Sequence, residues 1–241
     1  MNDDAAVALD AVSFGWPGAP PLLEGLSMQA PGGAITAIVG ESGTGKSTVL
    51  RLVAGLLQPS AGSVIAPPGE RAFVFQTPTL LPWRTVAENV VLPLELQRVP
   101  AEEARRRVDE ALTRVGLRES SGLLPRQLSG GMRMRASLAR AMVTRPALLL
   151  MDEPFSALDP LTRKRVQQEF LSLWSERRFT VLMVTHDADE AALLADRVVV
   201  LGGRPARVRA TLEIPLPRPR SAELLHDPAL GRLAATIEAA L

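Results

Sequence analysis

The sequence predicts an α/β fold, built on a mostly parallel sheet that is covered on both faces. Short apolar runs of strand length alternate with segments of helical period, and this alternation is typical of parallel sheets. The five predicted strands are Thr36 to Val39, Ala72 to Phe75, Ala147 to Met151, Thr180 to Val184 and Arg197 to Leu201.

Three segments between these strands carry a helical pattern. The run from Val49 to Leu57 follows a glycine-rich loop. The run from Ala101 to Val115 places apolar residues on one face and charged residues on the other, and the run from Arg163 to Glu176 repeats this arrangement. We therefore expect helices in these three segments.

The two ends of the chain differ from this middle part. Two strand-like pieces, Ala8 to Phe14 and Leu26 to Gln29, are separated by Pro-Gly turns and predict a small N-terminal antiparallel β-subdomain. Near the other end, a proline-rich link at residues 215–219 precedes a short predicted helix, for which Asp227 and Pro228 would form the N-cap and the first turn.

The chain is expected to form one domain with three parts. Residues 77–145 are poor in strand patterns and predict a helical subdomain that is inserted between core strands. The core with its β-subdomain would then comprise residues 1–76 and 146–212, and residues 213–241 would form a C-terminal tail.

Composition excludes several classes of protein. The 241 residues are 46% hydrophobic and 22% charged, which is ordinary for one large globular domain. The net charge of +1 gives no bulk attraction to nucleic acid, so no nucleic-acid partner is expected. The absence of cysteine removes disulfide and thiolate chemistry.

No apolar stretch reaches the roughly 18 residues that suggest a membrane-spanning helix. We expect an intracellular protein that meets a membrane only through a partner.

A glycine-rich motif follows the first predicted core strand. It fits the pattern G-x-x-x-x-G-K-[ST] and precedes an apolar helical run, which is the context that a phosphate-binding loop requires. The motif consists of Gly40, Glu41, Ser42, Gly43, Thr44, Gly45, Lys46 and Ser47. Its glycines allow backbone N–H groups to surround phosphate oxygens, and the following helix directs the positive end of its dipole at them.

The polar residues of this loop have distinct predicted roles. Lys46 would neutralise the β- and γ-phosphates, Ser47 would ligate Mg²⁺, and Thr48 would reach the α-phosphate. The alternative is a glycine-rich turn with one exposed lysine. Because Lys46 and Lys164 are the two lysines among 27 basic residues, a lysine at this position favours the role of a compact point charge.

Two acids end the predicted strand that begins at Ala147. Ligand sites of open α/β sheets lie at the carboxyl ends of strands. Asp152 would hold Mg²⁺, and Glu153 would act as the general base that polarises the attacking water. Acids also end strands at ordinary surfaces, but the phosphate loop upstream favours the catalytic interpretation.

A second anion site is predicted at Ser129, Gly130 and Gly131. These residues directly precede Met132 to Thr144, a run of strong helix formers that Pro146 ends. A helix N-terminus with a hydroxyl and two amides free of side chains binds anions. Two such sites for one triphosphate suggest that each site is shared between two protomers.

The segment that contains these residues, Leu128 to Met132 (LSGGM), resembles the LSGGQ motif of ABC ATPases. Other elements of that family are present in the same order over about residues 7–212. They are Trp16 as an adenine-stacking aromatic, Gln76 as the Q-loop glutamine, Ser156 to Asp159 as the D-loop and His186 as the switch histidine. Met132 replaces the commonest glutamine, which affects only the contacts of that glutamine. Singly, each of these residues would fit an ordinary structural role, and it is their joint order that favours function.

The resemblance implies a RecA-like P-loop NTPase core and a dimer that binds two ATP molecules between its subunits. Lys46 and the loop would hold the phosphates, and Ser47, Gln76 and Asp152 would surround Mg²⁺. His186 would hold the γ-phosphate. Ser129, Gly130, Gly131 and Asp159 would act in trans.

The same resemblance implies a transporter subunit on the cytoplasmic face of the cell membrane. Residues 76–90 would dock a permease, with an extracytoplasmic solute-binding protein as an indirect partner. The LLPWRTVAENV stretch, LSGGM and the late proline-arginine run resemble importer ATPases of the nitrate/sulfonate/taurine type. Relatives that handle thiamine-precursor pyrimidines or riboflavin share much of this pattern. An ABC export ATPase, a soluble ABC ATPase that acts on ribosomes or DNA, and a P-loop kinase are the alternatives.

Overall fold

A computed structural model describes residues 5–220, 224 and 227–241. The strands are β1 (Ala5–Phe14), β2 (Leu23–Pro31), β3 (Ile35–Gly40), β4 (Ala61–Ile65), β5 (Arg71–Val74), β6 (Leu148–Asp152), β7 (Thr180–Val184), β8 (Arg197–Gly202) and β9 (Arg207–Glu213). The α-helices are α1 (Lys46–Val53), α2 (Val86–Leu96), α3 (Ala101–Arg114), α4 (Gly130–Met142), α5 (Pro160–Arg177), α6 (Ala188–Leu194) and α7 (Pro228–Ala240).

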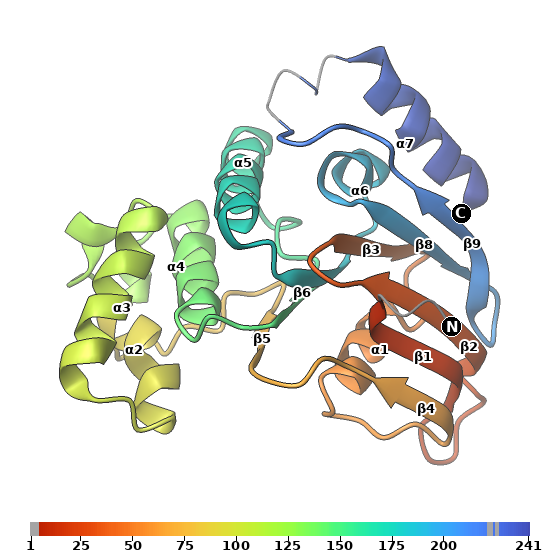
Figure 1. The fold of residues 1–241 in the computed structure, drawn as a ribbon, viewed down its shortest axis with the longest axis horizontal. Helices are drawn as coiled ribbons and strands as arrows, with labels where there is room; N and C mark the ends of the chain where they lie inside the picture. The colour runs from red at the N-terminus through yellow and green to blue at the C-terminus, as the bar shows by residue number, and fades with distance from the viewer. Residues whose placement is uncertain (1–4, 221–223, 225–226) are drawn as a thin grey trace.

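The main sheet has six strands in the order β5-β6-β7-β3-β8-β9. The first five are parallel, and β9 pairs antiparallel with β8 at the edge (Figure 1). A separate sheet, β2-β1-β4, is antiparallel. The predicted α/β class, the five core strands and the small antiparallel sheet are therefore confirmed.

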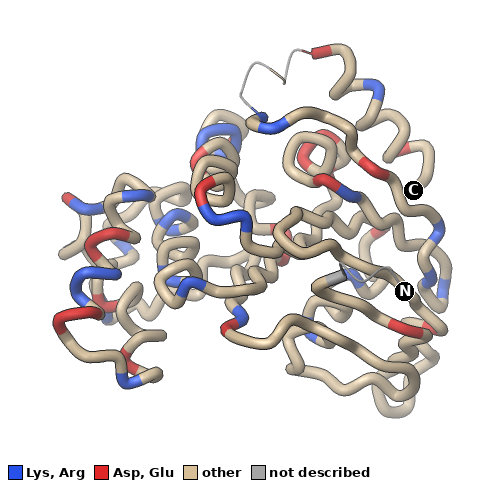
Figure 2. The backbone as a smooth tube through the Cα atoms, viewed as in Figure 1, with Lys and Arg blue, Asp and Glu red and all other residues tan. Residues whose placement is uncertain are grey.

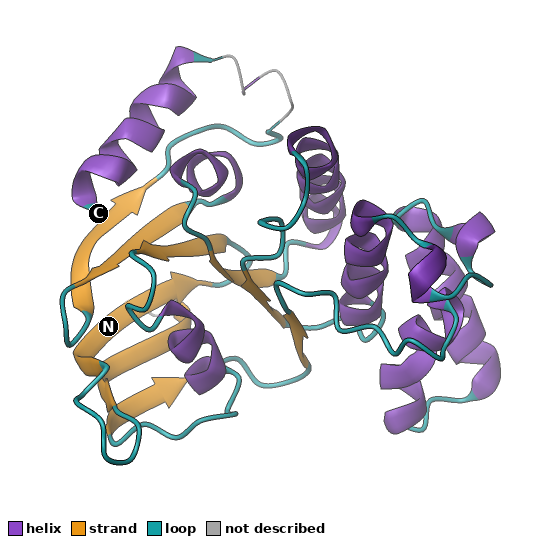
Figure 3. Ribbon diagram, turned by 180° about the vertical axis from the view of Figure 1, so that it is seen from behind, coloured by secondary structure: helices purple, strands orange, loops and turns teal. Residues whose placement is uncertain are grey.

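Alternation along the parallel strands divides the core into two layers. In β6, Leu149 and Met151 pack in the cluster that contains α4 to α7, whereas Leu148 and Leu150 pack in the cluster that contains α1, β1 and β2. Helices thus cover one face of the sheet, and α1 and the three-stranded sheet cover the other (Figure 3). The strands are buried on both sides, which explains why they are continuous apolar runs in the sequence.

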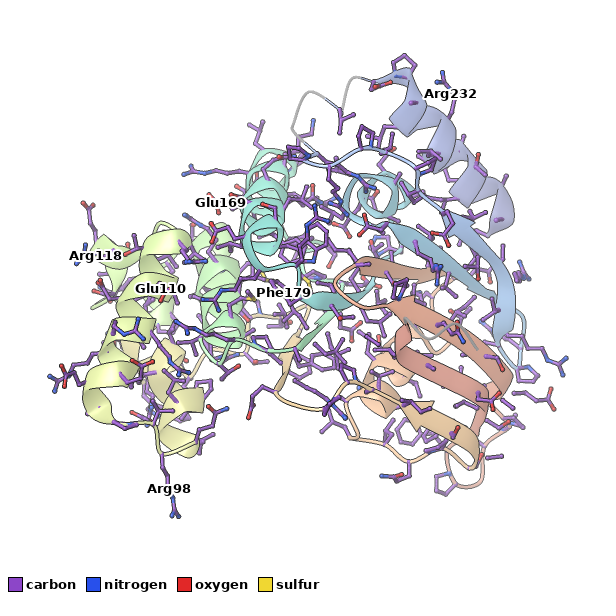
Figure 4. All side chains as sticks on the ribbon, viewed as in Figure 1. Arg98, Glu110, Arg118, Glu169, Phe179 and Arg232 are labelled. Atoms are coloured by element: carbon purple, nitrogen blue, oxygen red, sulfur yellow. The ribbon has the colours of Figure 1, made fainter. Side chains whose placement is uncertain are left out.

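Helices α2, α3 and α4 form the part of the chain that stands beside the sheet in Figure 1. Their facing residues, with Val90, Leu112 and Ala136 among them, form a hydrophobic cluster of their own. This cluster agrees with the predicted helical insertion, while the boundaries proposed for the three parts of the domain stay a prediction. Figure 4 shows Arg98 and Arg118 extending from the outer end of this part.

Ion pairs connect the helical part to α5. Glu110 of α3 lies 3.1 Å from Arg114, 3.3 Å from Arg145 and 3.7 Å from Arg177 of α5 (Figure 4), and Arg114 also pairs with Glu176 of α5. All of these side chains are partly exposed, so each pair contributes little to stability by itself. Together they fix the side of α5 to which the helical part is attached.

Several predictions need correction. The first predicted helix, Val49 to Leu57, is α1, and it begins at Lys46 and ends at Val53. The loop therefore passes directly into the helix, and Lys46 is its first residue. Strand β5 ends at Val74 rather than at Phe75, which is exposed. The strands β4 and β9 and the helix α6 were not predicted.

The C-terminal helix begins as predicted. Asp227 is the N-cap of α7, its side chain accepts a hydrogen bond from the Ala229 N–H at 2.8 Å, and Pro228 is the first helical residue. Residues 221–223 and 225–226 of the predicted tail lie outside the described residues. Within the described residues, no helix combines the length and the apolar character that crossing a membrane requires.

Candidate functional site

The glycine-rich loop occupies the end of a central strand. Strand β3 is buried along its whole length between β7 and β8, and the loop after Gly40 joins it to α1. A Cβ atom at Gly40 would lie 2.6 Å from the Leu201 carbonyl oxygen, which no side chain tolerates. At Gly45 the N-cap of α1 has a φ of 89°, a conformation that favours glycine. Both glycines are therefore required by the backbone path of the loop.

Lys46 lies inside this loop. Its Nζ donates hydrogen bonds to the carbonyl oxygens of Gly40 at 2.7 Å and Glu41 at 2.9 Å, and only 6% of the residue is exposed. Burial lowers the pKa of Lys46, and the charges of Glu153 and Asp152 act in the opposite direction. The ammonium is thus a partly desolvated cation that bonds to two backbone oxygens. Two carboxylates are close enough to affect its pKa.

Ser47 and Asp152 come together from distant parts of the sequence. The Ser47 hydroxyl donates a hydrogen bond to Asp152 Oδ1 at 2.8 Å. Burial raises the pKa of Asp152, whereas this hydrogen bond and the charge of Arg51 lower it. A hydroxyl beside a carboxylate supplies the hard oxygen ligands that Mg²⁺ takes together with the oxygens of a nucleotide.

Ser47 and Asp152 are the residues that the sequence predicts as Mg²⁺ ligands, and they supply one hydroxyl and one carboxylate. Over residues 5–220, 224 and 227–241, no group of three or more His, Cys, Asp or Glu side chains could hold a metal ion. Mg²⁺ characteristically uses one or two carboxylates plus phosphates and water, so this donor set fits a metal that arrives with a nucleotide.

Glu153 and His186 face each other at the same edge of the sheet. His186 Nδ1 lies 3.0 Å from Glu153 Oε2, and 62% of the His186 side chain is exposed against 23% for Glu153. Glu153 has a φ of 44°, a left-handed conformation that is rare outside glycine, and its N–H donates to the Val184 carbonyl at 3.0 Å. Such conformations concentrate at functional sites, where the surrounding structure holds them in place.

Gln76 reaches this site through another residue. It is exposed, two residues beyond the end of β5, and its Nε2 donates to the Ser156 hydroxyl at 3.1 Å. Ser156 in turn donates to the Glu153 carbonyl oxygen at 2.9 Å. The structure therefore brings Gln76 next to the predicted D-loop and Glu153, and the predicted contact of Gln76 with Mg²⁺ stays a prediction.

Trp16 and the phosphate loop border one pocket. Trp16 is 46% exposed, and Phe14 supports it edge to face, with the ring centroids 5.1 Å apart and the planes at 87°. The pocket is lined by Trp16, Leu22, Ser42, Gly43, Gly45, Lys46, Ser47, Thr48 and Glu153. The predicted aromatic, loop and base thus share one cavity. Leu22 was not predicted, because no sequence pattern distinguishes it from its apolar neighbours.

The residues predicted as a second anion site lie at the N-terminus of α4, as expected, and anion binding there stays a prediction. Ser129 is the N-cap, and its hydroxyl accepts a hydrogen bond from the Met132 N–H at 3.3 Å. Ser129 and Gly130 are exposed, whereas Gly131 is buried, and a Cβ there would lie 2.3 Å from Thr162 Cγ2 of α5. Gly131 is thus needed for the packing of α4 on α5. Its predicted contact in trans stays a prediction.

The helix tip and the phosphate loop of one chain lie apart. The described residues that line the loop pocket include none from α4, and Figures 1 and 3 both show α4 separated from α1. Asp159, the other residue predicted to act in trans, is exposed and caps α5 by accepting a hydrogen bond from the Thr162 N–H at 3.1 Å. One chain alone therefore does not bring its two anion sites together.

The parallel sheet, the loop between β3 and α1, the buried lysine and the carboxylate at the end of β6 define a P-loop NTPase. Residues 23–156 match the family described as ABC transporter, and the chain belongs to this family. It is an ABC ATPase of the type that is coupled to transport and it binds ATP.

Three similar proteins illustrate the relationship. The nitrate import ATP-binding protein NrtD of Synechococcus elongatus is 44% identical over 88% of this chain and 81% of its own length. The bicarbonate transport ATP-binding protein CmpD of the same species is 44% identical over 86% of this chain and 78% of its own. The ATP-binding cassette MJ0796, solved as a dimer bound to ADP and Pi, matches with a TM-score of 0.76 and 30% identity, covering 86% and 98% of the two chains.

A buried acid lies beneath the His186 segment. Glu190 of α6 is 6% exposed, and its Oε1 accepts a hydrogen bond from Gln167 Nε2 at 2.8 Å. Burial raises the pKa of Glu190, while hydrogen bonds from Thr185 and Gln167 lower it. The folded protein therefore holds this proton more tightly than the unfolded chain does. Its contribution to stability is complete below the unfolded pKa and is lost as the pH rises through the folded pKa.

We expect Glu190→Gln to be more stable than the parent at pH 8, because the amide keeps the acceptor oxygen and cannot become a buried charge. The gain should shrink towards pH 4, which lies below the ordinary glutamate pKa of 4.5. Thermal unfolding at several pH values measures this, with a shift of about 2–4 °C for each kcal/mol. A variant that is equally or less stable at pH 8 would contradict the assignment. Glu238→Gln, on α7, is the control.

Proposed function

We propose that two copies of this chain bind two ATP molecules between them and hydrolyse ATP to drive solute import through a membrane permease. The observation that carries the proposal is the exposure of Ser129 and Gly130 at the tip of α4, away from the loop pocket of their own chain. An exposed anion site that its own chain leaves unused fits a nucleotide held by a second copy. The dimeric relative MJ0796 supports this arrangement.

The residues of the loop pocket have complementary roles in the proposal. Trp16 stacks on the base, and the loop amides with Lys46 hold the phosphates. Ser47 and Asp152 hold Mg²⁺, which neutralises phosphate charge when it is bound, and Gln76 approaches it from the β5 side. This proposal is supported by the 2.8 Å Ser47–Asp152 hydrogen bond, which brings a hydroxyl and a carboxylate together beside the loop.

Glu153 is proposed as the general base. It lines the loop pocket and directly follows β6, the strand next to β7, so its carboxylate would be close to a γ-phosphate bound in that pocket. His186, 3.0 Å from Glu153, is proposed to contact the γ-phosphate with its exposed ring. Catalysis would then consist of positioning and charge stabilisation, which is the usual character of phosphoryl transfer.

The proposed permease surface lies between β5 and α2. Trp83 is 73% exposed there, while Leu80 and Leu81 are partly buried and Leu80 packs against the helical cluster. The apolar surface expected from residues 80–83 is therefore dominated by Trp83. Large exposed aromatic residues are typical of interfaces. A permease bound here would place the chain on the cytoplasmic face of the membrane, with a solute-binding protein on the other side.

The proposed transporter is an importer of the nitrate/sulfonate/taurine type. The relative NrtD is named for nitrate import, which favours import over export, and CmpD is named for bicarbonate transport, which favours transport over a non-transport role. In Figure 2 basic and acidic residues are interspersed along the described chain. The expectation that nucleic acid is not a partner stays a prediction.

We expect Glu153→Gln to bind ATP normally and to hydrolyse it at least about 100-fold more slowly, because the amide cannot accept the proton of the attacking water. Bound ATP should then accumulate, and the dimer should persist in size-exclusion chromatography. Phosphate release measures the rate. Glu102→Gln, on the exposed face of α3, is the control. Turnover at the parental rate in Glu153→Gln would show that another group is the base.

We expect Ser129→Arg to block hydrolysis while ATP binding remains, because the added side chain fills the helix tip and leaves the loop of its own chain intact. Fluorescent-nucleotide binding and phosphate release measure the two properties separately. Ser175→Arg introduces the same side chain at an exposed position of α5 and should leave both properties unchanged. Full activity in Ser129→Arg would contradict the shared site.

We expect the protein purified from native membranes to retain an integral membrane permease. Trp83→Glu should lose this partner and keep ATP binding, because it places a charge in the proposed contact surface. Leu96→Glu is a matched control, since Leu96 is 77% exposed at the far end of α2. Mass spectrometry of the purified complex identifies the partner. Equal retention by Trp83→Glu would contradict this docking surface.

A further inference from the structure

Arg163 of α5 connects two loops that flank the proposed base Glu153. We propose that Arg163 is a positioning residue that connects the turn from Ser156 to Asp159 to the segment that carries His186. This connection keeps the side chains of Glu153 and His186 in the relative positions that hydrolysis requires. The inference rests on the proposed function, because it assumes the roles given above to Glu153 and His186.

On one side Arg163 contacts the backbone of residues 155–158, which overlap the turn from Ser156 to Asp159. Its Nε donates to the Phe155 carbonyl at 3.2 Å, and its Nη2 donates to the carbonyls of Ser156 and Leu158, both at 3.3 Å. Three hydrogen bonds from one planar fork to three backbone oxygens fix the path of this turn. The turn includes Ser156, whose hydroxyl donates to the Glu153 carbonyl at 2.9 Å.

On the other side Arg163 holds the residue after His186. Its Nη1 lies 3.4 Å from Asp187 Oδ2. The second oxygen of Asp187 caps α6 by accepting the Glu190 N–H at 2.9 Å, and the Asp187 N–H donates to the Thr185 hydroxyl at 3.1 Å. Asp187 therefore contacts Thr185 through its N–H and the start of α6 through its carboxylate, and that carboxylate is paired with Arg163.

The two sides meet at Glu153. His186 contacts its carboxylate at 3.0 Å, and Ser156 contacts its carbonyl. Among the contacts described, Arg163 touches neither a residue of the loop pocket nor the reacting groups. Two of its partners lie next to Glu153: Ser156 bonds to the Glu153 carbonyl, and Asp187 follows His186, which contacts the Glu153 carboxylate. Its side chain is only 30% exposed, so its hydrogen bonds are partly protected from water.

A purely stabilising role is the alternative. Such a role predicts that removal of Arg163 lowers the unfolding temperature and leaves the activity of the folded fraction unchanged. A positioning role predicts that the folded variant binds ATP as before and hydrolyses it more slowly, because the small displacement of a catalytic group affects the transition state more than nucleotide binding.

The test compares Arg163→Gln, Asp187→Asn and the double variant. Asparagine keeps the N-cap of α6 and removes the charge that Arg163 contacts, so Asp187→Asn tests the same connection if Arg163→Gln does not fold. Arg165→Gln is the control, because Arg165 is on the same helix and pairs only with Glu169 among the contacts described. The kcat and KM for ATP, fluorescent-nucleotide affinity and thermal unfolding are measured at a temperature where every variant is folded.

We expect kcat to fall about 10- to 100-fold in Arg163→Gln, with KM and nucleotide affinity within about threefold of the parent. The double variant should be no slower than the slower single variant, because both changes break one connection. A kcat within twofold of the parent, or single effects that multiply in the double variant, would overturn the proposal. Glu153→Gln is measured in parallel. If it hydrolyses ATP normally, the role of Glu153 in the proposed function has failed, whereas a slow Glu153→Gln beside a normal Arg163→Gln overturns only the role of Arg163.

Discussion

The enclosure of the Lys46 ammonium is the interaction on which the rest of the site depends. The cation is held between the loop carbonyls of Gly40 and Glu41, and the charges of Asp152 and Glu153 offset its desolvation. The loop, the start of α1 and the end of β6 are thus positioned by one buried charge. A partly desolvated cation with compensating carboxylates is also a suitable receptor for a phosphate chain, because it is already aligned before the ligand arrives.

Much of the fold was predictable because its signals are local. The core strands are buried on both faces and are therefore continuous apolar runs, such as Leu148 to Met151. The loop from Gly40 to Ser47 was recognisable because its glycines meet backbone constraints that only glycine satisfies at this spacing. The helix tip at Ser129 was predictable for a similar reason, since a cap and a run of helix formers are adjacent in the sequence.

The features that escaped prediction depend on contacts between distant residues. Strand β9 alternates between exposed and half-buried positions at the edge of the sheet, so its pattern is weak, and α6 has only seven residues. Arg220 is fully buried, where it donates to the carbonyls of Ala192, Leu193 and Ala195 at the end of α6, and burial lowers its pKa to about 10. No local pattern marks an arginine for such a position.

The direct packing of α4 on α5 at Gly131 has a mechanical consequence. At this point the Thr162 side chain of α5 fills the space beside Gly131, and the Thr162 N–H also donates to Asp159. Ser129 and Asp159 are therefore carried by a pair of helices that cannot slide past one another without a clash. A force that a neighbouring protein applies to the helical part would therefore move both residues together. In the proposed dimer, they would approach or leave the second copy of the chain as one unit.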